Sequence, residues 1–150
     1  MKKRPAARLL VIDPQNRILL FNFKFDNGAL KGQDYWATVG GGVERGESIE
    51  ETARRELLEE TGITEPIREK IHFRRATFQV PSGEMVEAEE HYFLVTVSHS
   101  RIDYSNHTEM ETQVMREHHW WTREELEATS VTVFPENILE ILEPYLAQPV

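Results

Sequence analysis

The chain of 150 residues carries 17 Lys and Arg against 26 Asp and Glu, which gives a formal net charge of −9 at pH 7. This acidic balance argues against a general nucleic-acid or membrane-surface binder, because both of those surfaces are polyanions. The sequence has no cysteine, which excludes a disulfide, a thiol nucleophile and a cysteine-ligated zinc site.

Composition and length together indicate a globular protein. Hydrophobic residues make up 39% of the chain and charged residues 29%, which is typical of a soluble domain with a substantial core. The basic N-terminus is not followed by a long apolar run, so neither a signal peptide nor a transmembrane segment is expected. We therefore expect one domain over residues 1–150, located in the cytoplasm.

The N-terminal part of the chain predicts a strand hairpin. Residues 7–12, with an apolar run at 9–12, predict a buried strand, residues 13–16 have turn chemistry, and residues 17–23 return as a second strand. A polar loop over residues 26–34 and a short strand over residues 35–39 follow, and that strand leads into a glycine-rich loop.

Aromatic residues alternate at the end of the second predicted strand, at Phe21, Phe23 and Phe25. Alternation places them on one face of the strand. Core packing explains such a face most simply. The alternative is a wall on which a substrate base stacks, and we take Phe25 as the candidate contact.

The best-defined element is a helix predicted over residues 49–61. Ser48 and Glu51 have the spacing of a capping box, and Gly62 follows the last helical residue. Neither Gly nor Pro interrupts the interior. The glycine-rich loop, residues 40–47, therefore runs directly into a helix rich in carboxylates.

Three of those carboxylates, Glu56, Glu59 and Glu60, lie three or four positions apart on one side of the helix. Because like charges at this spacing repel, an isolated helix would be weakened by them. Glu60 also falls within the arc that Ala53 and Leu57 turn toward the core. A divalent cation with oxygen ligands would cancel the repulsion, which indicates metal-assisted chemistry on a phosphate ester or anhydride. The alternative is a solvated acidic face.

The same stretch resembles the signature of the Nudix (MutT-like) hydrolase family. Its pattern covers residues 41–63 and is complete at every specified position: Gly41-x5-Glu47-x7-Arg55-Glu56-Leu57-x-Glu59-Glu60-x-Gly62-Ile63. Many members have proline before the paired glycines, where this chain has Val39. That difference concerns the rigidity of the loop and leaves the ligand set unchanged.

The resemblance implies a hydrolase of nucleoside diphosphate derivatives that uses Mg²⁺ or Mn²⁺. By the family pattern, Glu56, Glu59 and Glu60 are metal ligands. Arg55 orients Glu56, and Glu47 is an auxiliary carboxylate. The backbone carbonyl of Gly40 or Gly41 is a further candidate metal contact, for which we take Gly41.

A second hairpin is predicted over residues 67–80 and 85–97, joined by a turn at residues 81–84. Arg74 and Arg75 are neighbours on the first of these strands and therefore face opposite sides of it. At most one of them would point toward a site on a given face. Either is a candidate phosphate clamp, because arginine binds phosphate oxygens through two N–H groups. An exposed strand arginine is the alternative for each.

Residues 98–107 are polar and irregular in pattern, and acidic residues follow them. In the family that the chain resembles, a glutamate outside the signature often binds metal or activates water. Glu111 and Glu117 are the candidates, and the sequence leaves the choice between them open. His118 and His119 are adjacent but lack a second pair at zinc-ligand spacing, so we read them as strand residues on opposite faces.

The C-terminal part predicts a short capped helix over residues 123–128 and a last helix from Pro135 to about Leu146. The whole order, with strands connected mostly by hairpins and few helices, indicates an α+β fold with a mixed sheet. The resemblance makes this a Nudix-like α/β/α sandwich in which residues 41–63 form the loop–helix–loop motif.

The function that follows is Mg²⁺-dependent cleavage of a diphosphate linkage in a nucleotide by attack of water on phosphorus. An enzyme resembling isopentenyl-diphosphate isomerase would need a catalytic cysteine, which this chain lacks. A nucleotide-binding or regulatory module that lost its chemistry is the other alternative, although such relatives usually lose signature carboxylates. A nucleotide-type small molecule is the expected partner, with no membrane or nucleic-acid partner. The resemblance leaves a homodimer open.

The substrate itself is not fixed by the sequence. Some Nudix subfamilies carry a marker about fifteen to eighteen residues beyond the signature, a proline for ADP-ribose or a tyrosine for dinucleoside polyphosphates. Residues 78–80 occupy that region, with Pro81 at its far edge. This is not a convincing match. Nucleoside triphosphates, including oxidised ones, therefore remain as open as ADP-ribose.

Overall fold

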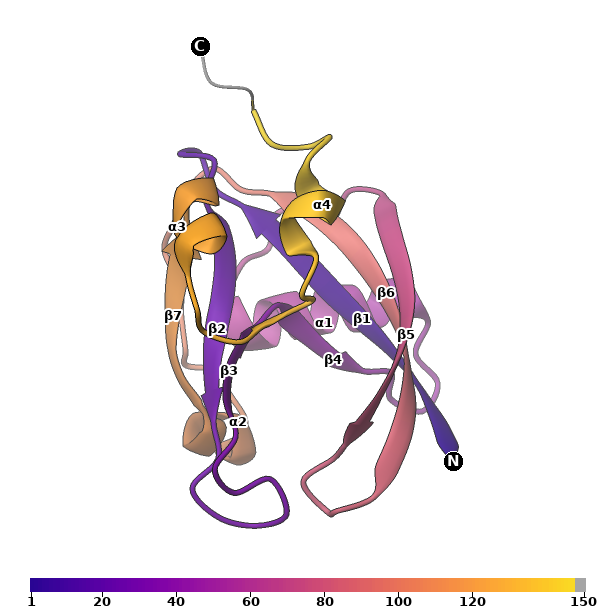
Figure 1. Ribbon diagram of the computed structural model, residues 1–150. Coiled ribbons are helices and arrows are strands. Elements are labelled where there is room, and N and C mark those ends of the chain that lie inside the picture. Colours follow the sequence, from indigo (N-terminus) through magenta and orange to yellow (C-terminus); the bar gives the residue numbers. More distant parts are fainter. Residues whose placement is uncertain (148–150) are drawn as a thin grey trace.

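The structure, a computed structural model, describes residues 1–147 and has a mixed β-sheet with helices on both faces (Figure 1). The elements follow in the order β1 (Lys2–Ile12), β2 (Ile18–Lys24), β3 (Asp34–Ala37), β4 (Val39–Gly42), α1 (Ile49–Thr61), β5 (Lys70–Gln79), β6 (Met85–Thr96), α2 (Glu109–Val114), β7 (Met115–Trp121), α3 (Arg123–Ala128), β8 (Val133–Phe134) and α4 (Ile138–Leu142).

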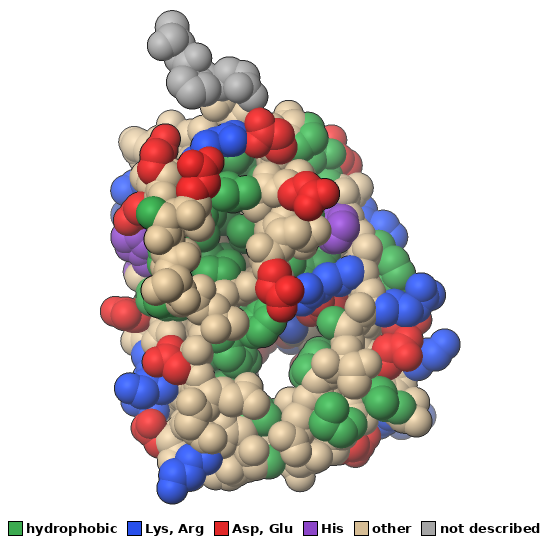
Figure 2. All heavy atoms as spheres, in the orientation of Figure 1, with side chains coloured by type: hydrophobic (Ala, Val, Ile, Leu, Met, Phe, Trp, Pro, Cys, Tyr) green, Lys and Arg blue, Asp and Glu red, His purple; other side chains and the backbone are tan. Residues whose placement is uncertain are grey.

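The sheet divides into two halves that meet at one end. β1 and β2 pair only at Ile12 and Ile18, so the two strands diverge from that point. β1 then pairs with β6 in parallel and with β4 on its other edge, while β2 lies between β3 and β7. β5 completes the first half beside β6, and β8 completes the second beside β3. A hollow is visible in the lower part of the molecule, which Figure 2 shows in the same orientation as Figure 1.

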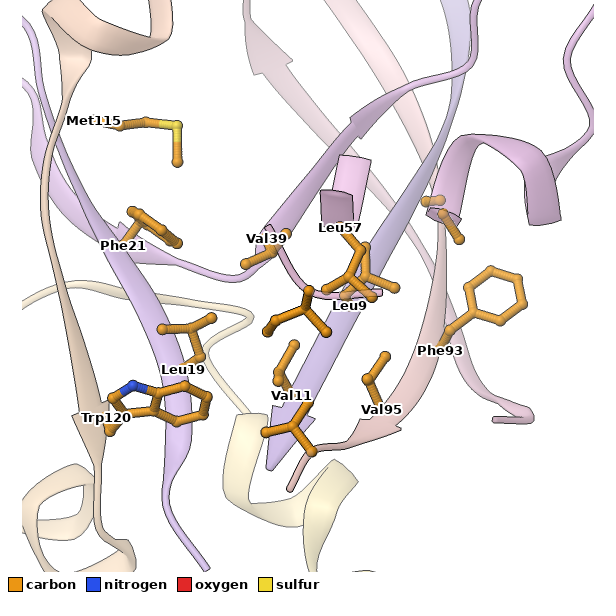
Figure 3. Packing of buried hydrophobic residues seen from close by; sticks show 14 residues of the cluster. Leu9, Val11, Leu19, Phe21, Val39, Leu57, Phe93, Val95, Met115 and Trp120 are labelled. Atoms are coloured by element: carbon orange, nitrogen blue, oxygen red, sulfur yellow. The ribbon is translucent and has the colours of Figure 1, made fainter. Parts of the chain in front are cut away.

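Two hydrophobic clusters fill the two faces of the sheet. The first lies between the sheet and α1, and β1 contributes to it Ala7, Leu9 and Val11 (Figure 3). The second lies under α4 and contains the alternate residues of the same strand, Leu10 and Ile12. This alternation explains why residues 9–12 are all apolar: this part of the strand is buried on both faces.

The helix that carries the acidic residues forms as its sequence predicts. The Ser48 hydroxyl accepts from the Glu51 N–H at 3.1 Å, and the Glu51 carboxylate accepts from the Ser48 N–H at 2.9 Å. Gly62 adopts the left-handed conformation, with φ 76°, and donates its N–H to the Leu58 carbonyl. Both ends of α1 are therefore fixed by local hydrogen bonds.

The strand predicted over residues 35–39 is divided into two. β3 pairs with β2, and after Thr38 the chain changes partner so that β4 pairs with β1. The first residues of the predicted glycine loop, 40–42, thus belong to a strand. Their lack of side chains permits this pairing: a Cβ at Gly40, where φ is 143°, would lie 2.1 Å from the Ala7 carbonyl oxygen.

The last helix is shorter than the sequence prediction of Pro135 to Leu146. α4 begins only at Ile138, because residues 133–134 pair with β3 and hold the chain in the sheet. It ends at Leu142, since Pro144 has no N–H to donate to a helical carbonyl. A helix that the sequence analysis missed, α2, is capped by Thr108 and Glu111 in the manner of α1.

Within the described chain, no helix combines the length and the apolar content that crossing a bilayer would require.

Candidate active site

Four carboxylates gather where α1 and α2 approach each other behind β4. Oxygen atoms of Glu56, Glu59 and Glu111 all lie within 4.8 Å of one another, and we call these three residues the carboxylate group. Glu56 is buried, while Glu59 and Glu111 are half-buried. Glu60 lies beside the group and is also buried, with 2% of its surface exposed.

The four positions reach one place for simple geometric reasons. Glu56, Glu59 and Glu60 share one side of α1, as their spacing predicts. Glu111 comes from α2, whose capping box holds one of its oxygens against the Thr108 N–H at 2.9 Å. α1 lies close to β4 because Gly41 has no side chain: a Cβ there would lie 2.5 Å from Glu56 Oε1.

Arg55 is the cation that holds the group in order. Its Nε and one terminal nitrogen donate to the two oxygens of Glu47 at 2.6 and 3.0 Å. The other terminal nitrogen donates to Glu56 at 3.0 Å and to Glu59 at 3.3 Å. A further bond to the Gly42 carbonyl, at 3.2 Å, ties the same guanidinium to β4. Arg55 therefore fixes two carboxylates relative to the strand beside them.

The surroundings separate the carboxylates by their pKa values. Burial, together with Glu59 and Glu111 nearby, raises the pKa of Glu56 to about 7, even though Arg55 opposes the shift. Burial also raises the pKa of Glu60, with Glu56 and Glu111 adding to the effect. In contrast, the Arg55 guanidinium lowers the pKa of Glu47 to about 2. Because their pKa values are raised, Glu56 and Glu60 bind protons more readily than free glutamates do, and a bound cation would compete with those protons.

Glu60 is held differently from the other three. Its Oε1 accepts from the Gly40 N–H at 2.7 Å, and its own backbone carbonyl accepts from His107 Nε2 at 2.7 Å. His107 directly precedes the cap of α2 and stacks on Tyr104, with ring centroids 4.8 Å apart. The sequence analysis missed His107, which links the end of α1 to the loop that positions Glu111.

The structure distinguishes the two glutamates that the sequence left open. Glu111 belongs to the carboxylate group. Glu117 lies on β7 opposite Asn22, is exposed, and has His118 and Tyr104 as its charged or polar neighbours. The signal for Glu111 was present in the chain, because Thr108 and Glu111 have capping-box spacing.

The two candidate arginines also lie in different places. Arg74 donates its Nε to Glu90 at 2.6 Å, on the face of the sheet that Tyr92 and Arg8 share. Arg75 is on the other face, 61% exposed, 3.7 Å from Glu87 and Glu89. The two arginines therefore lie on opposite faces of the sheet, and only Arg74 shares a face with Arg8 and Tyr92.

Aromatic side chains line the opposite half of the sheet. Phe25 lies just beyond β2 and, like Phe23, stacks on Tyr35, with centroids 6.3 and 5.6 Å apart. Tyr35 also meets the edge of Phe134. We call Phe23, Phe25 and Tyr35 the aromatic wall. Phe25 is itself buried, with 8% of its surface exposed, and Phe21 is fully buried and packs in the first core cluster (Figure 3).

Comparison with known proteins gives a family-model match to the NUDIX domain over residues 2–141. An RNA pyrophosphohydrolase of Wolbachia pipientis is 25% identical over 95% of this chain and 88% of the relative. The oxidized purine nucleoside triphosphate hydrolase of Danio rerio and the nucleoside triphosphatase NudI of Escherichia coli are each 48% identical, over 42% and 35% of this chain. Those matches span 37% and 36% of the two relatives.

Solved structures agree on the fold. The dihydroneopterin triphosphate pyrophosphohydrolase of E. coli superimposes with a TM-score of 0.63 at 19% identity, over 95% of this chain and 97% of that one. The NUDIX domain of Shewanella oneidensis NrtR, solved with ADP ribose, gives a TM-score of 0.67 at 16% identity, over 96% and 88% of the chains. The α/β/α arrangement with a mixed sheet is therefore confirmed.

Proposed function

Because the chain belongs to the NUDIX domain family, we propose that it is a divalent-metal-dependent hydrolase that cleaves a diphosphate linkage in a nucleotide derivative. By family it is a Nudix-type pyrophosphohydrolase. The observation that carries the metal dependence is the convergence of Glu56, Glu59 and Glu111 within 4.8 Å. Arg55 contacts two of these carboxylates, and a divalent cation would compensate the remaining negative charge.

The residues present fit a magnesium or manganese ion. Hard divalent cations take oxygen ligands, and the site offers carboxylates from two helices together with the backbone of β4. In this proposal Glu56, Glu59 and Glu60 are ligands from α1, and Glu111 is the ligand or base from outside the signature. The Gly41 carbonyl is a further candidate. When bound, the ion neutralises phosphate oxygens and lowers the pKa of a water.

The chain's own groups then have separate tasks. Arg55 holds Glu56 and Glu59 in place, and Glu47 holds Arg55 through two hydrogen bonds. We propose that a carboxylate of this group accepts the proton of the attacking water. Glu111 suits this task because its second oxygen is not used by the capping box.

The substrate that the site supports is a nucleotide-type small molecule. The relatives are named for an RNA pyrophosphohydrolase and for nucleoside triphosphate hydrolases, and one structural neighbour was solved with ADP ribose. These names share the phosphoanhydride of a nucleotide and differ in the rest of the molecule. We propose that the aromatic wall receives the base.

The experiment is a phosphate- and pyrophosphate-release assay on nucleoside triphosphates, nucleotide sugars, ADP-ribose and dinucleoside polyphosphates. Each substrate is incubated with Mg²⁺, with Mn²⁺ and with EDTA. We expect at least one class to be hydrolysed with metal and none with EDTA. Equal rates in EDTA would contradict the metal dependence. Nucleotide binding without hydrolysis of any class would favour the regulatory module instead.

A further inference from the structure

Three arginines lie together on the far side of β4 from the carboxylate group. Arg4 and Arg8 occupy alternate positions of β1 and so point to one face of the sheet, and Arg74 of β5 reaches the same place. We call Arg4, Arg8 and Arg74 the arginine cluster. Glycine again permits the packing: a Cβ at Gly42 would lie 2.6 Å from Arg4 Nε.

One buried carboxylate organises two of these arginines. Glu90 is 3% exposed, and it accepts from Arg8 Nε at 3.0 Å, from Arg74 Nε at 2.6 Å and from the Tyr92 hydroxyl at 3.2 Å. Burial opposes ionisation of Glu90, but Arg8 and Arg74 outweigh it and lower its pKa. Glu90 is therefore a charged anchor with all its protein donors in place.

The terminal nitrogens of Arg8 and Arg74 are not used by this anchor. Both side chains bind Glu90 through Nε, and among residues 1–147 their terminal nitrogens donate no hydrogen bond to a protein atom. These atoms are not sealed in the protein either, because the only fully buried side-chain nitrogen or oxygen without a partner in that range is Trp121 Nε1. They are therefore open to a ligand.

The cluster also has an excess of positive charge. The cluster contains three arginines and one paired carboxylate, Glu90, in a chain whose formal charge is −9, while Glu56 and Glu60 act on Arg4 and Arg8 from beyond ion-pair distance. In the described part of the chain, Arg4 forms no ion pair within 4.0 Å, although it is more than half buried. Burial, followed by the nearby Arg8, lowers its pKa. A structural ion pair needs one cation for each anion, whereas this cluster has three arginines and one paired glutamate.

The strands that carry the cluster, β1 and β5, lie beside a hollow in the molecule (Figures 1 and 2). Figure 2 shows a hollow in the lower part of the molecule, with basic and acidic side chains at its upper rim. In Figure 1 this hollow lies between the loop after β2 and the β5–β6 hairpin. Burial raises the pKa of Tyr35 and the charge of Arg8 opposes this shift, so Tyr35 of the aromatic wall lies within electrostatic range of the cluster.

We propose that the arginine cluster binds a second phosphate group of the substrate, one that is not part of the diphosphate being cleaved. This proposal depends on the proposed function in one respect only: it takes the phosphate-bearing ligand to be the substrate of the hydrolase. Guanidinium groups with free terminal nitrogens bind phosphate oxygens in pairs, and they do so best where a second group fixes their orientation. Glu90 is then the positioning residue for Arg8 and Arg74.

The first experiment measures anion binding without metal. The intact protein in EDTA is titrated with inorganic pyrophosphate. Binding is measured by calorimetry and by changes in the NMR signals of the arginine Nε–H groups. The carboxylate group repels anions when no metal is present, so binding reports on the arginine cluster. Sodium chloride at matched ionic strength controls for screening. We expect saturable binding, with the signals of Arg8 and Arg74 shifted.

Variants assign that binding to the cluster. Arg8→Gln and Arg74→Gln should each weaken pyrophosphate binding by roughly tenfold or more, because each removes charge-assisted hydrogen bonds. Arg75→Gln is the matched control: it removes an arginine of the same strand on the opposite face, and affinity should stay within about twofold of the wild-type value. Arg8→Lys keeps a cation beside Glu90 in case Arg8→Gln fails to fold, and should lose affinity as well.

Two results would overturn the proposal. One is the absence of binding in EDTA up to about 10 mM pyrophosphate, a concentration that would reveal even a weak site. The other is unchanged affinity in both Arg8 variants. Because no metal and no turnover enter this experiment, its failure leaves the proposed hydrolase intact, and an inactive protein in the release assay leaves the binding result intact.

A kinetic arm identifies the substrate class. For any substrate of the release assay that carries a second phosphate beyond the cleaved diphosphate, Arg8→Gln should raise KM by roughly tenfold with kcat retained. For substrates without that phosphate, KM should not change. An equal rise of KM for both kinds of substrate would mean that Arg8 only supports the fold, and would contradict the proposal.

Discussion

Glu60 is the residue whose burial is hardest to explain without a ligand. It is 2% exposed, lies among other carboxylates, and has Gly40 N–H as its hydrogen-bond donor. A purely structural core would gain from an apolar residue here, since a buried acid costs free energy unless it is paired. A cation shared with Glu56 supplies the pairing in our proposal.

We expect Glu60→Gln to keep the fold and lose catalysis. The amide oxygen of glutamine can still accept from the Gly40 N–H, and the raised pKa of Glu60 shows that the site tolerates a neutral group. Turnover should fall by roughly a hundredfold and Mg²⁺ affinity by roughly tenfold, because a charged ligand is lost. Near-normal rates at saturating Mg²⁺, with unfolding free energy unchanged, would remove Glu60 from the ligand set.

Glu111 and Glu117 give a matched pair. Glu111→Gln should reduce both Mg²⁺ affinity and kcat by roughly tenfold or more, since Glu111 shares the site with Glu56 and Glu59. Glu117→Gln changes a neighbouring glutamate that is exposed on β7, and should leave both values within about twofold. If the two variants behave alike, the structural distinction between them has no functional meaning.

These residues also show where sequence reasoning ends. The spacing of Glu56, Glu59 and Glu60 predicts one strip on a helix, because that relation is local. The choice between Glu111 and Glu117 depends on how α2 packs behind β4, which no local pattern encodes. Arg8 was missed for the same reason: its partner Glu90 is 82 positions away in the chain.

At the scale of elements, capping chemistry predicts helix bounds well. α1 and α3 begin and end where the sequence analysis placed them, because the capping residues act on their immediate neighbours. α4 departs from prediction because pairing of β8 with β3 and Pro144 compete with its apolar pattern. The glycine segment became part of β4 because tertiary pairing with β1 overrode its loop-like composition.

α2 should be a weak element on which the site depends. It has six residues, none of them buried, and its capping box holds Glu111. Thr108→Ala removes the hydroxyl that accepts from the Glu111 N–H, which costs about 1 kcal/mol of helix stability. We expect faster hydrogen exchange over residues 109–114 and weaker Mg²⁺ binding, with little change in the global unfolding free energy.

Thr122→Ala is the control for that variant. It removes the same kind of cap from α3, which also has six residues and none buried, and which carries no residue of the carboxylate group. Mg²⁺ affinity should then remain at the wild-type value. Equal loss in both variants would indicate a general effect of destabilisation rather than the positioning of Glu111.

At the scale of the whole molecule, the two diverging halves of the sheet create the space that the site needs. The carboxylate group and the arginine cluster lie on opposite faces of β4, since Glu56 packs against Gly41 and Arg4 against Gly42, and the aromatic wall belongs to the other half of the sheet. The β5–β6 hairpin could be predicted from its turn residues, whereas the strands of the predicted β1–β2 hairpin pair only at Ile12 and Ile18. The parallel pairing of β1 with β6 joins segments far apart in sequence, and it could not be predicted locally.

The metal-free protein should lose stability as the pH rises from about 5 to about 8. The pKa of Glu56 is raised from 4.5 to about 7 in the folded state, so between those values the folded chain binds more protons than the unfolded chain. Stability therefore falls with rising pH, by up to about 3 kcal/mol for this group. Saturating Mg²⁺ should abolish the decline, because it binds the folded carboxylates.

Urea unfolding at several pH values, with EDTA and with Mg²⁺, measures this effect. Carboxylates whose pKa is lowered, such as Glu47, change their protonation below pH 5. Their effect on the unfolding free energy therefore does not overlap with the decline between about pH 5 and 8. A stability in EDTA that rises with pH over the interval would contradict the electrostatic description of the site.

The central claim is that carboxylates of α1 and α2 exist to hold a divalent cation against a diphosphate. The most direct measurement is anomalous scattering from a crystal grown with Mn²⁺ and a non-hydrolysable nucleotide analogue. We predict a manganese peak between Glu56, Glu59 and Glu111, in contact with phosphate oxygens of the analogue. Manganese bound elsewhere, with these three side chains turned to solvent and the nucleotide in place, would contradict the account.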